Sequence, residues 1–153
     1  MGALMFVFQV AMSGLPNIHI TDVFIIITVV FFGWKALYSV AVFIMLEGLV
    51  WGISMWWFCY WYLWPVFVVA CIIMRKNDSA LIWAVVAGMH GICFGALCSI
   101  PFLFMGGWQT AFARWISGIT FDFAHCAGNF VFTLILYHPL KKVMSIAMKE
   151  GKI

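Results

Sequence analysis

Long apolar runs, broken only by short polar stretches, constrain this chain more than any other feature. Residues 23–33, VFIIITVVFFG, contain no charged residue, and similar runs recur along the whole chain. The runs are continuous rather than alternating, which argues against a β-barrel. With 67% hydrophobic and 8% charged residues, the chain has too few polar side chains to cover a soluble fold. The sequence therefore predicts an all-α integral membrane protein with a single transmembrane domain, residues 1–153.

Glycine, proline and short polar motifs divide the apolar pattern into about six helices. The predicted helices span residues 2–13, 20–33, 36–54, 62–74, 80–104 and 110–138, and a basic tail follows over 139–153. Pro65 is expected in the first turn of the fourth helix, Pro101 as a kink in the fifth, and Pro139 as the end of the sixth. The first, second and fourth segments are short for a hydrocarbon core of about 30 Å. An alternative to six full crossings is therefore that two of these segments are re-entrant or broken.

The positions of the basic residues predict which ends face the cytoplasm. If both termini are cytoplasmic, Lys35, the Arg75–Lys76 pair and the C-terminal lysines all lie on the inner side, and only Arg114 departs from the rule. The tail is expected to touch the lipid bilayer, and no nucleic-acid partner is expected. The aromatic block at 55–64, MWWFCYWYLW, is typical of the outer interface. Five cysteines without a CxxC pair are expected to be buried thiols.

Polar side chains line one face of the predicted sixth helix. At 100° per residue, Asp122, His125 and Asn129 share one stripe of an otherwise apolar segment. Polar groups inside a membrane are costly, so they are expected to face protein or water and to mark a functional site. Ligand binding and simple helix packing are both consistent with this stripe.

Glu47 and Trp51 lie one turn apart on the predicted third helix and offer a carboxylate beside an aromatic wall. This combination suits a small polar or cationic aromatic ligand. The alternative is that Glu47 pairs with Arg114 or Lys35 only to orient helices. Tyr60 is expected where a ligand enters, and Gly106 and Gly107 are expected to make the loop before Trp108 a lid.

Two other classes of function stay open from the residues alone. One is a metal-dependent enzyme or metal-binding protein that uses Asp122 and His125, joined by His90 or Cys126, although the spacing matches no established zinc motif. The other is an ion-coupled transporter with Glu47 as its proton-binding carboxylate. His19, in the first outer loop, is equally well explained as a solvated residue. On the predicted fifth helix, small residues at four-residue spacing predict close approach to another helix.

Two stretches resemble a known family. Residues 115–140, WISGITFDFAHCAGNFVFTLILYHPL, resemble the last helix of the substrate-binding S components of energy-coupling factor (ECF) transporters, where FD, a following His, GN and a closing PL occur in that order. Residues 15–52 are similar to the region after the first helix in that family, with its short loop, glycine turn and LEG segment. The family pattern leads us to expect an acidic residue after PNI, where this chain has His19.

The resemblance implies a six-helix, multi-pass protein of the bacterial plasma membrane that captures a vitamin or related micronutrient at its outer face. It implies a transmembrane coupling protein and two cytosolic ATPases as partners, with ATP used by those ATPases. The chain itself is then expected to be no enzyme and to hold no cofactor or metal. The residues expected to bind the substrate are Glu47, Trp51, Tyr60, Trp108, Arg114, Asp122, His125 and Asn129.

Overall fold

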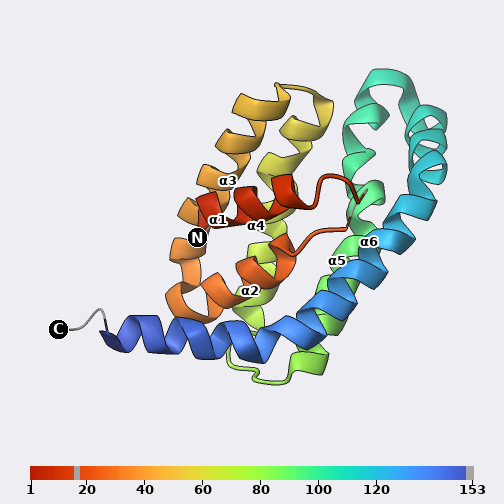
Figure 1. The fold of residues 1–153 in the computed structure, drawn as a ribbon. Helices are drawn as coiled ribbons and strands as arrows, with labels where there is room; N and C mark the ends of the chain where they lie inside the picture. The colour runs from red at the N-terminus through yellow and green to blue at the C-terminus, as the bar shows by residue number, and fades with distance from the viewer. Residues whose placement is uncertain (16–17, 151–153) are drawn as a thin grey trace.

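The computed structural model describes residues 1–15 and 18–150, and this part of the chain is helical without any strand. Figure 1 shows the helices in order: α1 (Gly2–Ala11), α2 (Thr21–Phe32), the 3-10 helix η1 (Gly33–Lys35), α3 (Ala36–Trp51), α4 (Met55–Ile73), α5 (Ala80–Cys98) and α6 (Ile100–Glu150). The predicted all-helical class is therefore confirmed. Residues 16–17 of the expected first loop and 151–153 of the expected tail lie outside the described residues.

Several helices are long and apolar enough to cross a membrane. Four stretches meet this condition by length and composition: Thr21–Trp51, Met55–Ile73, Ala80–Cys98 and Ile100–Glu150. The first of them turns a corner at Gly33 and so contains both α2 and α3 (Figure 1). α1, with 10 residues, is shorter than these stretches. These helices support a multi-pass membrane protein, while six crossings with cytoplasmic termini stay a prediction.

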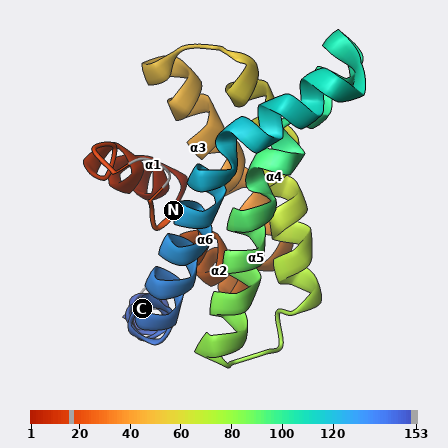
Figure 2. The ribbon, with the colours of Figure 1, turned by 90° about the vertical axis from the view of Figure 1, so that its right-hand side faces the viewer.

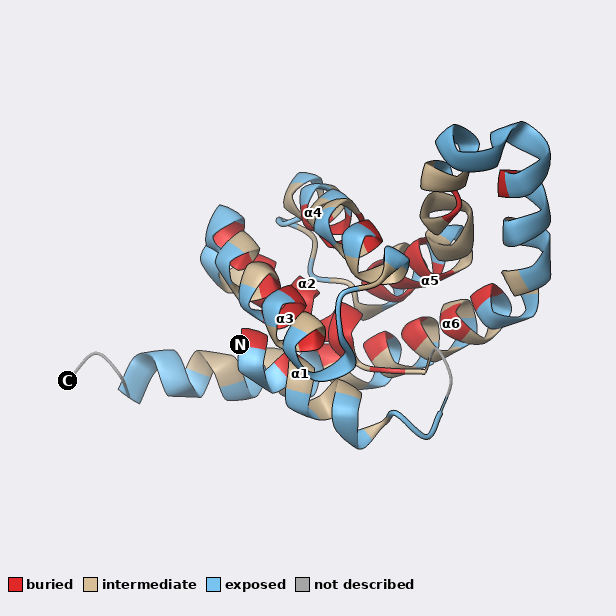
Figure 3. Cartoon of the chain, turned by 90° about the horizontal axis from the view of Figure 1, so that it is seen from above, coloured by how far each residue is buried: buried red, intermediate tan, exposed pale blue. Residues whose placement is uncertain are grey.

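α2 lies in the interior of the bundle. Its residues 21–29 are all buried, and the helix is apolar on nearly every side, which is the pattern of a helix surrounded by protein. Figure 3 shows its buried surface among α3, α4 and α6, which all pack against it. Asp22 belongs to the first turn of α2, so the packing of this helix carries a carboxylate into the core.

The corner between α2 and α3 depends on Gly33. Its φ of 59° and ψ of −132° lie in a region that residues with a Cβ rarely adopt. The Arg75 guanidinium lies against this glycine, and it donates hydrogen bonds to the carbonyls of Val30 (3.2 Å) and Phe31 (3.4 Å). A positive charge on the last carbonyls of a helix complements the helix dipole. The predicted turn after residue 33 is thus present, and Arg75 caps it.

α4 begins at Met55, well before the predicted start near residue 62. α3 ends at Trp51 because Gly52, with φ of 85°, breaks the helix before the predicted end at residue 54. The aromatic block therefore forms the first turns of α4 instead of preceding it. Pro65 lies in the helix interior, not in its first turn, which removes one backbone hydrogen bond. Trp64, next to it, is fully buried, and its ring packs against those of Phe43 and Tyr60.

α5 and α6 run side by side in close contact, as Figures 1 and 2 both show. A Cβ atom added at Gly91 would lie 2.7 Å from the backbone nitrogen of Cys126, so this glycine lets the two backbones approach. At Gly88 the nearest atom would be the Cys126 Sγ at an ordinary 3.5 Å. The small-residue pattern of the fifth predicted helix thus identified a real close contact, centred on Gly91.

The C-terminal half of the chain agrees with the prediction at the loop after residue 104 and departs from it at Pro139. α5 ends at Cys98, and Ser99 interrupts the helix two residues before Pro101, near the predicted kink, before helical backbone resumes at Ile100. α6 consists of two helical pieces joined at Gly107, whose φ of 74° and ψ of −174° are not helical, and this break lies within the predicted loop of residues 105–109. Pro139 does not end the helix, which continues through the expected tail to Glu150 and changes direction toward its C-terminal end (Figure 1).

A bridge beside Pro139 helps to explain this continuation. Asp78, in the loop between α4 and α5, accepts hydrogen bonds from the Tyr137 hydroxyl at 3.1 Å and from the Lys141 ammonium group. Tyr137 precedes Pro139 in the helix and Lys141 follows it. One carboxylate therefore holds α6 on both sides of the proline.

The five cysteines are free thiols, which agrees with the prediction that none is in a disulfide. Cys59 and Cys71 are buried in the bundle as expected, whereas Cys93 is exposed on the surface of α5. The fold is thus held by helix packing rather than by covalent links between helices.

Candidate functional site

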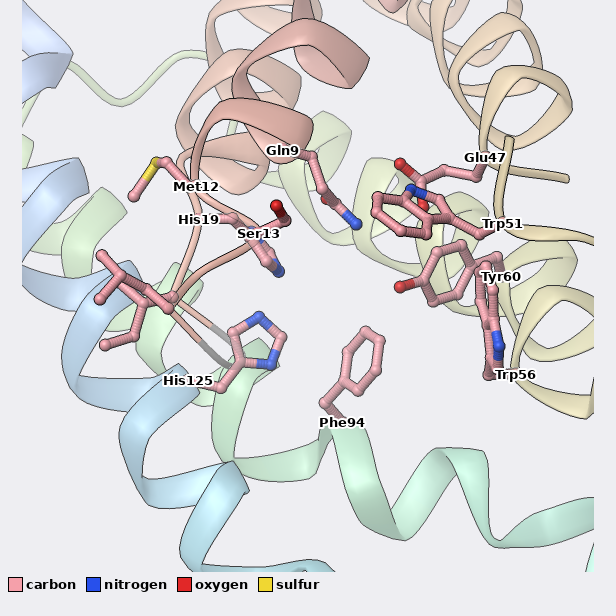
Figure 4. A pocket seen from close by; sticks show the side chains of 12 residues that line it. Gln9, Met12, Ser13, His19, Glu47, Trp51, Trp56, Tyr60, Phe94 and His125 are labelled. Carbon is pink, nitrogen blue, oxygen red and sulfur yellow. The ribbon is translucent and has the colours of Figure 1, made fainter. Parts of the chain in front are cut away.

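A cavity of about 380 Å³ lies between the N-terminal segment, α3, α4, α5 and α6 (Figure 4). Six of its lining residues carry rings: His19, Trp51, Trp56, Tyr60, Phe94 and His125. The polar lining is completed by Gln9, Ser13 and Glu47. This volume and this mixture of aromatic walls with a few polar groups are typical of small-molecule sites.

One wall of the cavity is aromatic and comes from α3 and α4. Figure 4 shows Trp51, Trp56 and Tyr60 together on one side of the space. The break at Gly52 brings the end of α3 next to the start of α4, and a spacing of four residues directs Trp56 and Tyr60 to the same face. The Tyr60 ring lies 5.1 Å from the Trp56 ring, so the wall is packed before any ligand arrives.

The same wall carries a buried carboxylate. Glu47 is 2% exposed, and its Oε1 atom has no hydrogen-bond partner in the described part of the chain. Among the described residues, the carboxylates in contact with a basic side chain are Asp22, with His90, and Asp78, with Lys141, so Glu47 is paired with neither Arg114 nor Lys35. The alternative of a purely orienting ion pair at Glu47 is therefore wrong for this structure.

The opposite wall contains two imidazoles. His19 comes from the segment before α2 and His125 from α6, and their ring centroids are 4.7 Å apart (Figure 4). Phe94 of α5 lies against His125 with its centroid at 4.8 Å. His19 is buried, so its interpretation as a solvated loop residue is wrong. Burial lowers the pKa of His19, with the Asp22 carboxylate acting in the opposite direction.

A buried polar network lies directly behind the imidazoles. The Asp22 Oδ2 atom is 2.7 Å from the Nδ1 atom of His90 and accepts a hydrogen bond of 2.9 Å from the Asn129 side-chain amide. Asn129 also donates to the carbonyl oxygen of Ala87 at 3.4 Å. Three helices, α2, α5 and α6, are thus joined through one carboxylate.

The polar stripe of α6 faces the protein, as the sequence pattern predicts. Asp122, His125 and Asn129 are each at most 2% exposed. The three side chains nevertheless serve different places, because His125 lines the cavity and Asn129 belongs to the network behind it. Asp122 accepts a hydrogen bond from the backbone N–H of Gly95 at 2.9 Å, where only a glycine leaves room for the carboxylate.

The expected binding residues therefore separate into groups. Glu47, Trp51, Tyr60 and His125 line the cavity described above. Arg114 and Asp122 line a second cavity of about 610 Å³, which Tyr60 also borders. Trp108 lines a third cavity of about 240 Å³.

Asp22 was absent from the residues expected to bind a ligand, and His90 entered only as a possible extra ligand. An acidic residue at the start of a helix is ordinarily explained by the helix dipole, so the sequence alone gave no reason to assign Asp22 a binding role. The sequence positions of both residues were the available signal: Asp22 is followed by an apolar run, and His90 lies among small residues on a helix that packs closely.

Comparisons of this chain with protein-family models, curated proteins and solved structures found no match.

Proposed function

We propose that this chain is a membrane-embedded binding subunit that captures a small, ring-containing micronutrient in the cavity between the His19–His125 wall and the Trp51–Tyr60 wall. The observation that carries this proposal is the cavity itself, which joins residues from five helices and has a volume suited to a molecule of vitamin size. Its aromatic wall suits stacking on a flat ring, and its polar groups suit hydrogen bonds to the substituents of that ring.

The charge of the lining narrows the ligand class. Glu47 contributes a carboxylate, and no lysine or arginine is among the residues that line this cavity. An anionic ligand would meet no compensating positive charge there, whereas a cationic ring would gain from Glu47 and from the indole faces. We therefore expect a neutral or cationic ligand rather than a carboxylate or phosphate.

The family resemblance supplies the setting for this binding step. As an S component of the ECF type in the bacterial plasma membrane, the chain would associate with a transmembrane coupling protein and two cytosolic ATPases. It would deliver its ligand to the cytoplasm at the expense of ATP hydrolysed by those partners. In this proposal the chain is no enzyme, and its six crossings have both termini on the cytoplasmic side.

A ligand screen tests the binding step. Purified protein in detergent is heated with a panel containing thiamin, riboflavin, a pyridoxine-like ring, cobalamin and tryptophan, and with aromatic carboxylates as the anionic comparison, and the unfolding midpoint is recorded. A ligand at about 100 times its Kd stabilises the folded state by about 2.7 kcal/mol, which is readily measured. A neutral or cationic ring compound that raises the midpoint supports the proposal. If only anionic compounds raise it, the assignment of the cavity is wrong.

Uptake into vesicles tests the transport step. The chain is reconstituted with and without the three-subunit module of coupling protein and ATPases, and uptake of the identified ligand is followed. Uptake that needs both the module and ATP on the side of the membrane where the ATPases lie supports the ECF-type function. Uptake that persists without the module and collapses with the proton gradient would instead favour an ion-coupled transporter that uses Glu47.

A further inference from the structure

Three buried side chains converge at the polar wall of the cavity. One nitrogen or oxygen atom from each of His19, Asp22 and His125 lies within 4.8 Å of the other two. His19 and Asp22 are three residues apart at the start of α2, whereas His125 comes from the middle of α6. The tertiary fold therefore brings His125 to the other two groups.

The atoms that converge lack hydrogen-bond partners. Within the described residues, no partner is found for Nδ1 of His19, Oδ1 of Asp22, or either ring nitrogen of His125. Asp22 and His125 are each 1% exposed. Buried polar atoms are normally satisfied, and each exception calls for an explanation such as an ion. Several such atoms close together indicate a bound electron-pair acceptor, such as a metal ion.

The second oxygen of Asp22 is held in place from behind. His90 and Asn129 both contact Oδ2, at 2.7 and 2.9 Å, and leave Oδ1 without a hydrogen-bond partner in the described part of the chain. Carboxylates that bind metals are commonly oriented by hydrogen bonds of this kind to their other oxygen. The aromatic ring of Phe67 stacks on His90 with centroids 4.3 Å apart, which fixes the orientation of the supporting imidazole.

We propose that His19, Asp22 and His125 bind a divalent transition-metal ion, with His90 and Asn129 as positioning residues. Two imidazoles and one carboxylate suit Zn²⁺, Ni²⁺, Co²⁺ or Fe²⁺, whereas Mg²⁺ and Ca²⁺ prefer oxygen ligands alone. Three protein ligands leave a coordination position open. Because His19 and His125 line the cavity, a nitrogen or oxygen atom of a molecule in the cavity would complete the shell.

The surrounding charge favours a cation. Asp22 supplies a carboxylate at the cluster itself, and no lysine or arginine lines the cavity beside it. This site differs from the metal site considered from the sequence, because Asp122 lines the second cavity and Asp22 takes its place. The inference does not depend on the proposed function, since an ion can bind whether or not an organic ligand is transported.

Metal titration tests the site directly. Protein purified without a polyhistidine tag and dialysed against chelator is titrated separately with ZnCl₂, NiCl₂ and CoCl₂, with no organic ligand present. Bound metal is measured by calorimetry and elemental analysis, and Co²⁺ by its visible absorption. One equivalent of at least one ion per chain is expected, with an increase in the unfolding midpoint on binding. Saturation below one equivalent for all three ions, or no binding at micromolar concentration, would overturn the proposal.

Variants locate the ion. His19→Ala, Asp22→Asn and His125→Ala should each weaken binding at least tenfold, and His90→Ala should weaken it by about 10–100-fold because it positions Asp22. His138→Ala removes an exposed histidine elsewhere on α6 and should leave the affinity unchanged. If the cluster variants bind as tightly as the native chain, or if His138→Ala abolishes binding, the assigned site is wrong.

Folding is separated from coordination by two further measurements. The unfolding midpoint of each variant is recorded without metal, and His90→Gln is compared with His90→Ala, because the amide can restore a hydrogen bond to Asp22. If His125→Ala does not fold, the Co²⁺ absorption of the native chain reports directly whether nitrogen ligands are bound. If the protein binds metal but no compound of the ligand screen, this inference stands and only the proposed function is rejected. If it binds a compound of the screen but no metal, only this inference is rejected.

Discussion

The Nδ1 atom of His90 lies 2.7 Å from the Oδ2 atom of Asp22, although 68 positions separate the two residues in the sequence. This contact links α5 to the first turn of α2, and the Asn129 amide extends it to α6. A carboxylate buried in an apolar bundle is tolerated because its partners satisfy one of its oxygens. The same contact leaves the other oxygen, Oδ1, without a hydrogen-bond partner among the described residues.

Asp22→Ala should destabilise the fold substantially. The change leaves buried donors on His90 and Asn129 without their acceptor, which costs about 1–3 kcal/mol for each unsatisfied group. The free energy of unfolding should be measured by denaturant titration in detergent and metal-free buffer. Asp78→Ala, at an exposed carboxylate, is the control and should have a much smaller effect. Equal effects of the two changes would mean that the buried network contributes little.

Gly91→Ala should be far more harmful than Gly88→Ala. The new methyl group at residue 91 would meet the backbone of α6 at 2.7 Å, and forcing the helices apart costs about 1–3 kcal/mol. At residue 88 the nearest atom would be at 3.5 Å, so alanine should be neutral or slightly stabilising through its higher helix propensity. Thermal unfolding of both variants compares the two sites, and the reverse order would contradict the observed helix contact.

Gly33→Ala should destabilise the corner between α2 and α3. A residue with a Cβ at a φ of 59° and ψ of −132° is strained by about 1–3 kcal/mol, and the new atom would also press on the Arg75 guanidinium. Gly118→Ala is the matched control, since it lies in α6 with no atom within 4 Å of the added Cβ. The unfolding midpoint should fall for Gly33→Ala only. A similar fall for Gly118→Ala would indicate a general effect of alanine and not strain at the corner.

The bridge at Asp78 should make stability depend on pH in the acid range. Hydrogen bonds from Lys141 and Tyr137 lower the pKa of the Asp78 carboxyl. Its stabilising contribution is therefore complete above the unfolded-state pKa of about 3.9 and is lost as pH falls through the lower folded-state value. Asp78→Asn should reduce the unfolding midpoint slightly at pH 7, and the difference from the native chain should vanish at the acid end. A constant difference at every pH would rule out a charged bridge.

Local patterns were sufficient to predict much of the fold. The apolar runs predicted a helical membrane protein, the glycine at residue 33 predicted a turn, and the spacing of Asp122, His125 and Asn129 predicted one buried stripe. Each of these features depends on residues a few positions apart, where helix geometry alone decides the outcome. The close contact at Gly91 was predictable for the same reason.

Features that depend on distant residues were not predictable in this way. Pro139 does not end α6, and Asp78, from the loop between α4 and α5, contacts residues on both sides of it. The aromatic block forms the first turns of α4, where Trp57 donates a hydrogen bond to the carbonyl of Ile44 in α3, 13 positions away. Asp22 and His90 meet only when α2 is enclosed by α4, α5 and α6, so no spacing within either helix reveals the pair.

The central claim is that the cavity between the imidazole wall and the aromatic wall is the ligand site. The most direct measurement is the equilibrium Kd of the ligand identified by screening, compared across variants that change one cavity at a time. Trp51→Ala and His125→Ala should weaken binding tenfold or more, at about 1.4 kcal/mol for each factor of ten. Trp108→Ala and Arg114→Ala, whose side chains line the other two cavities, should bind like the native chain. If Trp108→Ala and Arg114→Ala lose binding while Trp51→Ala and His125→Ala keep the native affinity, this cavity is not the ligand site.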